Sequence, residues 1–241
     1  MTEDDPRLIR AAELLAEGDH DSAAELLFAA WSEDTGNLDL AISYACLLAR
    51  IGREDEAEEL FAALADESPE DSRVWNNRGF LLLEKGDVSA AIAMQEKALS
   101  IAPEDFEALV NLGIALDRAG QTAEALEAYS RAVLVNPESP VAYNNMGAAY
   151  WRAGNGKDAL AAFRKALKLD PRDASAANNM GIIKMAEGDL EEAKGFFLQA
   201  LEIDPDSIAA ERNLEAVEEK IRSRPQQKDK EISCDTPPSL F

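Results

Sequence analysis

The sequence predicts an all-α fold made of antiparallel helix pairs that repeat along the chain. One residue pattern recurs at a constant interval, without insertion or deletion, over 204 of the 241 residues. A glycine divides each copy into two helical patterns, and a proline follows the second pattern in five of the six copies. Glycine and proline in these places end helices, so we expect a series of short paired helices.

We number each unit from 1 to 34, starting at Asp4. The six units are then 4–37, 38–71, 72–105, 106–139, 140–173 and 174–207. Position 15 is always glycine, which takes the left-handed backbone of a helix end at little cost. These glycines are Gly18, Gly52, Gly86, Gly120, Gly154 and Gly188.

Position 34 predicts where the first helix of each following unit begins. It is always Asn, Asp or Ser, the side chains preferred as N-caps. The six residues are Asn37, Asp71, Asp105, Ser139, Asp173 and Ser207. In the fifth unit Pro140 then takes the first helical position, where its missing N–H costs nothing.

Small residues recur on one face of the second helix. Positions 20 and 27 are alanine in every unit, except for Leu64 at position 27 of the second unit. Residues seven apart lie on the same side of a helix, so another helix is expected to come close there.

These positions resemble the tetratricopeptide repeat family, whose unit is a 34-residue helix–turn–helix. The fifth unit matches the family pattern with Tyr143, Met146, Gly147, Tyr150, Ala159, Phe163, Ala166 and Pro171. The resemblance covers 204 of the 241 residues. It implies a right-handed α-solenoid of antiparallel helix pairs, a superhelix whose first helices line the concave side.

The third unit departs from the family pattern. Arg78 stands at position 7 and Gln95 at position 24, where the fourth, fifth and sixth units carry apolar or aromatic residues. The sequence provides no physical account of this pair, and both a locally soft unit and an altered packing angle remain open.

The region after the repeats divides into two parts. Residues 208–223 predict a capping helix, which a solenoid needs to cover its last apolar face. Its apolar stripe is Ala210, Leu214, Val217 and Ile221. Residues 224–241 are polar and interrupted by proline, so we expect a disordered tail. Its end, 237–241, is either a free terminus or a short docking motif.

The charge is strongly acidic and unevenly distributed. The net charge is −23, and residues 1–71 contain twenty acidic and four basic side chains. Nucleic acid is not expected as a partner, because neutralising phosphates requires a basic face. Two interpretations of the negative charge stay open: it only keeps the protein soluble, or it attracts a basic protein partner.

The expected compartment is the cytoplasm. The two cysteines, Cys46 and Cys234, form no CxxC pair, so no disulfide framework is expected. The first residues lack the basic-then-apolar layout of a signal peptide. No apolar run approaches the roughly 18 residues of a membrane span, so no membrane partner is expected.

No pattern predicts an enzyme, a cofactor or a metal site. The single histidine, His20, lies in a turn between two aspartates. The stretch 154–158 superficially suggests a phosphate-binding loop, but Asp158 stands where that motif needs Ser or Thr.

The candidate binding residues lie on one face of the first helices, at positions 2, 5, 6, 9, 12 and 13. Position 6 is asparagine in four units, Asn77, Asn111, Asn145 and Asn179, and position 5 adds Asn76, Asn144 and Asn178. A carboxamide both donates and accepts, so a ladder of them is expected to hold an extended peptide backbone. The open alternative is that these amides only bond neighbouring helices or water.

Apolar and basic residues accompany this asparagine ladder. Phe80, Ile114 and Trp151 are expected to form apolar pockets for peptide side chains. Arg118 and Arg152, both at position 13, are expected either to hold an acidic ligand group or to lie solvated over the helix. The fifth unit combines Asn144, Asn145, Trp151 and Arg152, so we expect the centre of binding there.

The sequence therefore predicts a non-catalytic interaction module, an adaptor that binds an extended peptide segment of a partner protein. The alternative is an assembly scaffold, or a regulatory subunit of a multiprotein complex, that docks through its end or convex faces. Apolar residues in the first unit favour this alternative: Leu8, Ile9, Leu14 and Leu15. The oligomeric state is left open, with a monomer as the default.

Overall fold

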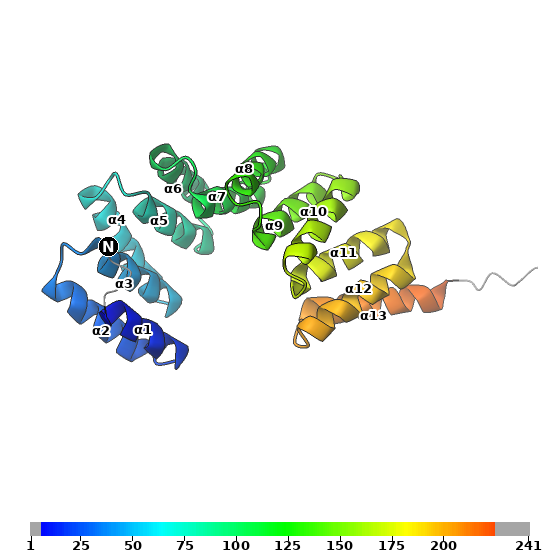
Figure 1. Cartoon of the computed structure of the whole chain (residues 1–241), viewed down its shortest axis with the longest axis horizontal. Helices are drawn as coiled ribbons and strands as arrows, with labels where there is room; N and C mark the ends of the chain where they lie inside the picture. The colour runs from blue at the N-terminus through cyan, green and yellow to red at the C-terminus, as the bar shows by residue number, and fades with distance from the viewer. Residues whose placement is uncertain (1–5, 225–241) are drawn as a thin grey trace, which may run out of the picture. The chain divides into compact units, whose positions relative to one another are not determined.

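The computed structural model describes residues 6–224. Within this range the chain forms thirteen α-helices and no strand, which confirms the all-α class (Figure 1). The helices are α1 (Pro6–Ala16), α2 (His20–Glu33), α3 (Leu38–Arg50), α4 (Glu54–Glu67), α5 (Ser72–Glu84), α6 (Val88–Ile101), α7 (Phe106–Arg118), α8 (Thr122–Val135), α9 (Pro140–Arg152), α10 (Gly156–Leu169), α11 (Ala174–Glu187), α12 (Leu190–Ile203) and α13 (Ile208–Ser223). The expectations for the tail from residue 225 onward, including Cys234, lie outside the described residues.

The helix ends follow the local signals of the sequence. All six glycines at position 15 have a positive φ, between +77° and +87°. Five of the six predicted N-caps form a side-chain bond to the next helix; Asn37 Oδ1, for example, accepts the N–H of Leu40 at 3.2 Å. Ser207 is the exception, because its side chain makes no capping hydrogen bond to α13.

Within each pair, the two helices meet through a small residue and a large one. In the fourth, fifth and sixth units the small residue is a glycine at position 8, and the aromatic ring at position 24 lies directly on it. A Cβ added at Gly113 would be 2.4 Å from the ring of Tyr129, and one at Gly147 would be 2.8 Å from the ring of Phe163. Both rings are fully buried. Glycine at position 8 is therefore a packing requirement of these pairs.

The third pair replaces the aromatic ring with a polar contact. Gln95 is 1% exposed, and its Nε2 donates to the backbone oxygen of Asn76 at 3.0 Å. Arg78 pairs with Glu58 on the preceding helix α4, at 2.8 Å between nitrogen and oxygen. Two polar contacts thus supply the physical account of this unit that the sequence lacks.

The chain divides into two compact units, and the first spans Met1–Ala176. From α1 to α10, consecutive helices of this unit pack against each other. The odd-numbered helices also pack side by side, α3 on α5, α5 on α7 and α7 on α9. In Figure 1, α5, α7 and α9 follow the inner edge of this unit and α6, α8 and α10 follow its outer edge. Helices α3, α5, α7 and α9 therefore form one continuous layer.

The second unit, Ala177–Phe241, contains most of α11 together with α12 and α13. Helix α13 packs on α12, with Val217 fully buried against Phe197. Leu214 and Ile221 pack on the same cluster. The stripe predicted for a capping helix is the face that α13 buries.

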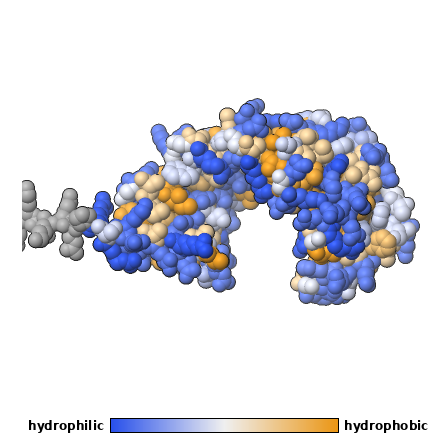
Figure 2. Space-filling view, turned by 180° about the vertical axis from the view of Figure 1, so that it is seen from behind, coloured by the Kyte–Doolittle hydropathy of each residue, from blue (hydrophilic) through white to orange (hydrophobic). Residues whose placement is uncertain are grey.

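Charged and polar side chains cover much of the surface. Figure 2 shows one face on which hydrophobic residues form small patches separated by hydrophilic ones. Large apolar side chains that are exposed come from several helices: Ile9, Phe28, Phe80, Leu134, Val135, Val141, Trp151, Leu198 and Ile208. Among the described residues, no helix is both long and apolar enough to cross a membrane.

Candidate functional site

The predicted binding residues of the first compact unit lie on α5, α7 and α9, which form one layer with α3. We call their common surface the odd-helix face; it carries positions 2, 5, 6, 9, 12 and 13 of each unit. Because neighbouring odd-numbered helices pack side by side, equivalent positions of successive units come within reach of one another. Each predicted residue can therefore be assigned a role from what it touches on the next helix.

Asparagines at positions 5 and 6 pair across neighbouring helices. Asn111 on α7 donates its Nδ2 to Oδ1 of Asn76 on α5 at 2.9 Å. In the second compact unit, Ala177–Phe241, Asn213 on α13 donates to Asn178 on α11 in the same way, also at 2.9 Å. The partners stand 35 residues apart in both cases. These amides connect helices, which is the alternative that the sequence left open for the ladder.

Asn213 was missing from the sequence prediction. It stands one full repeat after Asn179, at position 6 of a unit that consists of α13 alone. Extending the repeat numbering beyond the sixth unit would have found it. Asn144 and Asn179 are half-buried, and each takes part in interactions of its own.

Asn145 differs from the other members of the ladder. Position 5 of the preceding unit is Val110, which is apolar and buried. The side chain of Asn145 is half-buried and makes no hydrogen bond with any other described residue. Asn77 uses its Nδ2 locally, donating to the backbone oxygen of Arg73 at 2.8 Å. Among the four position-6 asparagines, Asn145 therefore keeps both its donor and its acceptor available.

An apolar cavity of about 350 Å³ lies on the odd-helix face between α3 and α5. Its lining residues are Cys46, Ala49, Arg50, Glu54, Phe61, Asn77, Phe80, Leu81 and Glu84. Phe61 and Leu81 are buried, whereas Phe80 is 50% exposed at the mouth. Charged groups at Arg50, Glu54 and Glu84 surround an apolar interior, and this arrangement suits one apolar side chain of a ligand.

Cys46 contributes to this cavity as an apolar group. Burial raises the pKa of its thiol to about 11, so the thiol stays protonated at neutral pH. Its Sγ lies 3.5 Å from Oδ1 of Asn77. Among the described residues it is a free cysteine, and its protonated state argues against a nucleophilic role.

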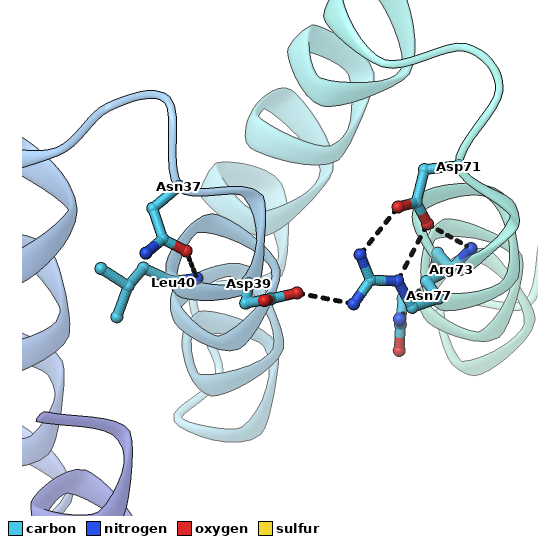
Figure 3. A network of polar contacts seen from close by, with 6 residues as sticks. All are labelled: Asn37, Asp39, Leu40, Asp71, Arg73 and Asn77. Carbon is cyan, nitrogen blue, oxygen red and sulfur yellow. Dashed lines mark hydrogen bonds and ion pairs between the residues drawn. The ribbon is translucent and has the colours of Figure 1, made fainter. Parts of the chain in front are cut away.

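Ion pairs also connect neighbouring helices of the odd-helix face. Arg73 on α5 donates to Asp39 on α3 at 2.6 Å and to Asp71 at 2.7 Å (Figure 3). The hydrogen bond to Asp71, and to a lesser extent the one to Asp39, raises the pKa of the Arg73 guanidinium. The hydrogen bond from Arg73 in turn lowers the pKa of Asp71. Asn77 follows one turn later on the same helix (Figure 3). The network thus joins α3 to α5 beside the cavity.

The two arginines predicted to hold an acidic ligand group have carboxylate partners of their own. Arg118 donates to the backbone oxygen of Leu83 at 2.8 Å and to Glu84 at 3.2 Å. Arg152 forms an ion pair with Asp117, whose side chain is only 6% exposed. A ligand carboxylate at either arginine would have to compete with these partners, and the ligand role remains a prediction.

The predicted aromatic and aliphatic residues occupy different surroundings. Phe80 lines the cavity between α3 and α5. Ile114 is half-buried and packs into the core around α7. Trp151 is 36% exposed at the end of α9. The sequence placed the centre of binding in the fifth unit, whereas this cavity lies between the second and third units.

Among residues 6–224, no group of three or more His, Cys, Asp and Glu side chains is arranged to hold a metal ion. His20 is exposed at the start of α2, directly after the N-cap Asp19. Its surroundings are those of a solvated helix end.

Three family models described as tetratricopeptide repeat match the chain. They cover residues 14–77, 70–133, and both 110–174 and 144–208. Together these matches extend from α1 to the start of α13. No curated protein matches the sequence.

Solved structures of the same fold resemble the chain over most of its length. PilW, described as a type IV pilus biogenesis factor, has a TM-score of 0.77 and 23% identity, covering 86% of this chain and 96% of its own. YrrB, described as a TPR protein with an unusual peptide-binding site, has a TM-score of 0.60 and 25% identity, covering 78% and 97%. MamA of Desulfovibrio magneticus has a TM-score of 0.63 and 24% identity, covering 70% and 96%.

Proposed function

The chain belongs to the tetratricopeptide repeat family, and we propose that it is a non-catalytic module that binds an extended segment of a partner protein on its odd-helix face. The observation that carries this proposal is the apolar cavity between α3 and α5. A bound segment would place one apolar side chain there and run along the layer towards α9. Proteins of this fold generally serve as interaction modules, which agrees with the proposal.

The cavity supports a side-chain anchor because of its size and lining. A volume of about 350 Å³ is at the small end of the range of ligand pockets, which run from about 300 to 1,000 Å³. It holds one large apolar side chain. Phe80 at the mouth offers a ring that water contacts in the free protein, so covering it would contribute to affinity.

Asn145 supports a backbone contact further along the same layer. Its amide has no partner among the described residues, so binding a peptide group there breaks no internal hydrogen bond. Asn111 would first have to give up its bond to Asn76. We therefore narrow the proposed ladder to Asn145 as the asparagine that holds the peptide.

The likeness to YrrB adds to this argument, since that protein is described as having a peptide-binding site and is 25% identical to this chain. The strong acidity of residues 1–71 favours partner segments with basic residues beside the apolar anchor. Opposite charges raise the rate of association more than they raise affinity.

The experiment selects ligands without assuming a partner. Random twelve-residue peptides displayed on phage are selected on the full chain, and the affinity of each selected peptide is measured by fluorescence anisotropy. Selection should yield peptides with a shared apolar residue. Peptides without a shared apolar position would contradict an anchoring cavity.

Cys46→Phe is the variant that fills the cavity. Phenylalanine already stands at the same position of the next unit, as Phe80, so the helix surface tolerates it. We expect the selected peptides to bind at least about tenfold more weakly, because the anchoring side chain would lose about 1.4 kcal/mol or more of its binding free energy. Urea denaturation should show stability close to wild type. Unchanged affinity in this variant would rule out the cavity as the anchor.

Asn145→Ala and Asn111→Ala separate binding from packing. Asn145→Ala should weaken peptide binding about fivefold, the effect of one lost hydrogen bond, and leave the free energy of unfolding unchanged. Asn111→Ala should lower the free energy of unfolding by about 1 kcal/mol, because Asn76 loses its partner. Anisotropy titrations and urea denaturation measure the two effects. The reverse pattern would show that Asn111 is the binding asparagine.

An assembly scaffold that docks through its end or convex faces is the second candidate. It is favoured by Ile9 on α1, which is 50% exposed, and by Leu134 on α8, which is 81% exposed. Light scattering over a range of concentrations tests self-association directly. A molar mass that stays at that of one chain would count against a self-assembling scaffold.

A further inference from the structure

A second hollow, separate from the odd-helix face, lies between α2, Tyr44 of α3 and the start of α4. Its volume is about 570 Å³. Besides Ala24, its lining residues are Asp21, Glu25, Phe28, Tyr44, Arg53 and Glu56. It shares no lining residue with the cavity between α3 and α5. The two sites can therefore be altered separately by substitution.

One wall of this hollow is a stripe along α2. Asp21, Glu25 and Phe28 stand four and three residues apart, so they project from the same side of the helix. The ring of Phe28 is 50% exposed, and its far side packs on Tyr44 with 5.6 Å between ring centroids. The hollow therefore presents an aromatic surface beside two carboxylates.

The two carboxylates of this wall have no cationic partner within residues 6–224. Neither Asp21 nor Glu25 takes part in an ion pair there, and both are exposed. Like charges four residues apart weaken a helix. Asp21 is in the first turn of α2, where the helix dipole favours a negative charge. Glu25 has no such compensation and adds a second negative charge beside the exposed ring.

The opposite wall already shows how this hollow holds a guanidinium. Arg53 donates Nε and Nη2 to the two carboxylate oxygens of Glu56, at 2.7 and 2.5 Å. This contact lowers the pKa of Glu56 and raises that of Arg53. Three carboxylates and one guanidinium thus line the hollow, which gives it a net charge of −2.

We propose that this hollow is a docking site for an arginine side chain of a protein partner. The guanidinium would stack on the exposed ring of Phe28 and bond to Asp21 and Glu25. Arginine fits better than lysine, because its planar group both stacks on an aromatic ring and forks to a carboxylate. The charge of residues 1–71, twenty acidic against four basic, would steer such a partner to this end of the chain.

The probe is the tripeptide acetyl-Gly-Arg-Gly-amide, titrated into the full chain and followed by NMR amide shifts. We expect saturable shifts confined to residues 21–28, 44 and 53–56. The lysine analogue should bind more weakly, and acetyl-Gly-Gly-Gly-amide should not bind. Shifts spread evenly over the acidic surface would overturn the proposal.

Two matched double variants separate this hollow from general acidity. Asp21→Asn/Glu25→Gln removes the two unpaired carboxylates, and Glu59→Gln/Asp66→Asn removes two exposed carboxylates of α4 that do not line the hollow. The first should weaken probe binding at least about threefold and the second less than about twofold. Equal weakening by both would show that only net charge matters.

Phe28→Leu tests the ring while keeping an apolar side chain of similar size. It should weaken binding about threefold, the loss expected of an exposed cation–π contact. Circular dichroism shows whether the fold is kept. Cys46→Phe should leave tripeptide binding unchanged, so this proposal and the odd-helix face can fail separately. An unchanged affinity in Phe28→Leu would overturn the stacking.

Discussion

Gly113→Ala is expected to lower the free energy of unfolding by about 2–3 kcal/mol. The added Cβ would lie 2.4 Å from Cε1 of Tyr129 and 2.7 Å from both Cδ1 and Cζ. Carbon atoms in contact are normally about 3.5–4.0 Å apart. Tyr129 is 1% exposed, so its ring cannot move into solvent, and the two helices of the pair must separate instead.

The sign of this effect distinguishes packing from helix propensity. In an exposed helix, alanine in place of glycine stabilises by about 1 kcal/mol. Gly195 in α12 is the matched control, because it is exposed and a Cβ there would meet no atom within 4 Å. Urea denaturation should show Gly195→Ala to be more stable than wild type. Equal effects at the two glycines would contradict the close approach at Gly113.

A second-site change checks that Tyr129 is the cause. Tyr129→Leu shortens the side chain that the new Cβ would meet. The loss in the double variant Gly113→Ala/Tyr129→Leu should therefore be smaller than the sum of the two single losses. We expect a coupling of about 1–2 kcal/mol, typical of residues in direct contact.

The helix ends could be predicted from the sequence because their causes are local. Gly120, for example, sets the backbone of its own turn, with a φ of +77°. An N-cap such as Asp105 bonds to an N–H three residues away. The constant repeat interval places both without knowledge of the rest of the fold. Ser207 failed as a cap, and nothing in the structure explains that exception.

The partners of the asparagines and arginines depend on how neighbouring helices are aligned. The repeat correctly places Asn77, Asn111 and Asn145 at equivalent positions. It does not show that Asn111 reaches Asn76, which is 35 residues away, or that Arg152 reaches Asp117, also 35 residues away. This offset follows from the packing of two helices, which a single helical pattern does not contain.

The cavity was harder still to predict, because three helices build it. Cys46 comes from α3, Phe61 from α4 and Phe80 from α5. Phe80 was predicted as a pocket residue from its position, but the depth behind it depends on the side chains of two other helices. Trp151 can be read from the sequence as a large aromatic residue of the fifth unit, whereas an empty volume between helices has no residue pattern of its own.

Breaking the ion pair between Arg78 and Glu58 is expected to lower the free energy of unfolding by about 2 kcal/mol. The guanidinium contacts Oε1 of Glu58 through two nitrogens, at 2.8 and 3.0 Å. Arg78→Leu would leave Glu58 without its cation between α4 and α5. Fully buried pairs lose about 3–5 kcal/mol in this way. The two side chains are 23% and 22% exposed, so we expect a smaller loss.

Replacing both Arg78 and Glu58 with leucine tests whether the third unit needs the ion pair itself or whether an apolar contact at the same place would stabilise it equally well. Position 7 is apolar in the fourth and fifth units, as Leu112 and Met146. The double variant Arg78→Leu/Glu58→Leu should therefore be within about 1 kcal/mol of wild type, since apolar replacements of buried ion pairs are often neutral or stabilising. Glu58 Oε2 supports this expectation, because it is buried without a hydrogen-bond partner among the described residues. A double variant that loses as much as Arg78→Leu alone would mean that the third unit depends on the ion pair itself. Urea denaturation of the two single variants and the double variant completes the cycle.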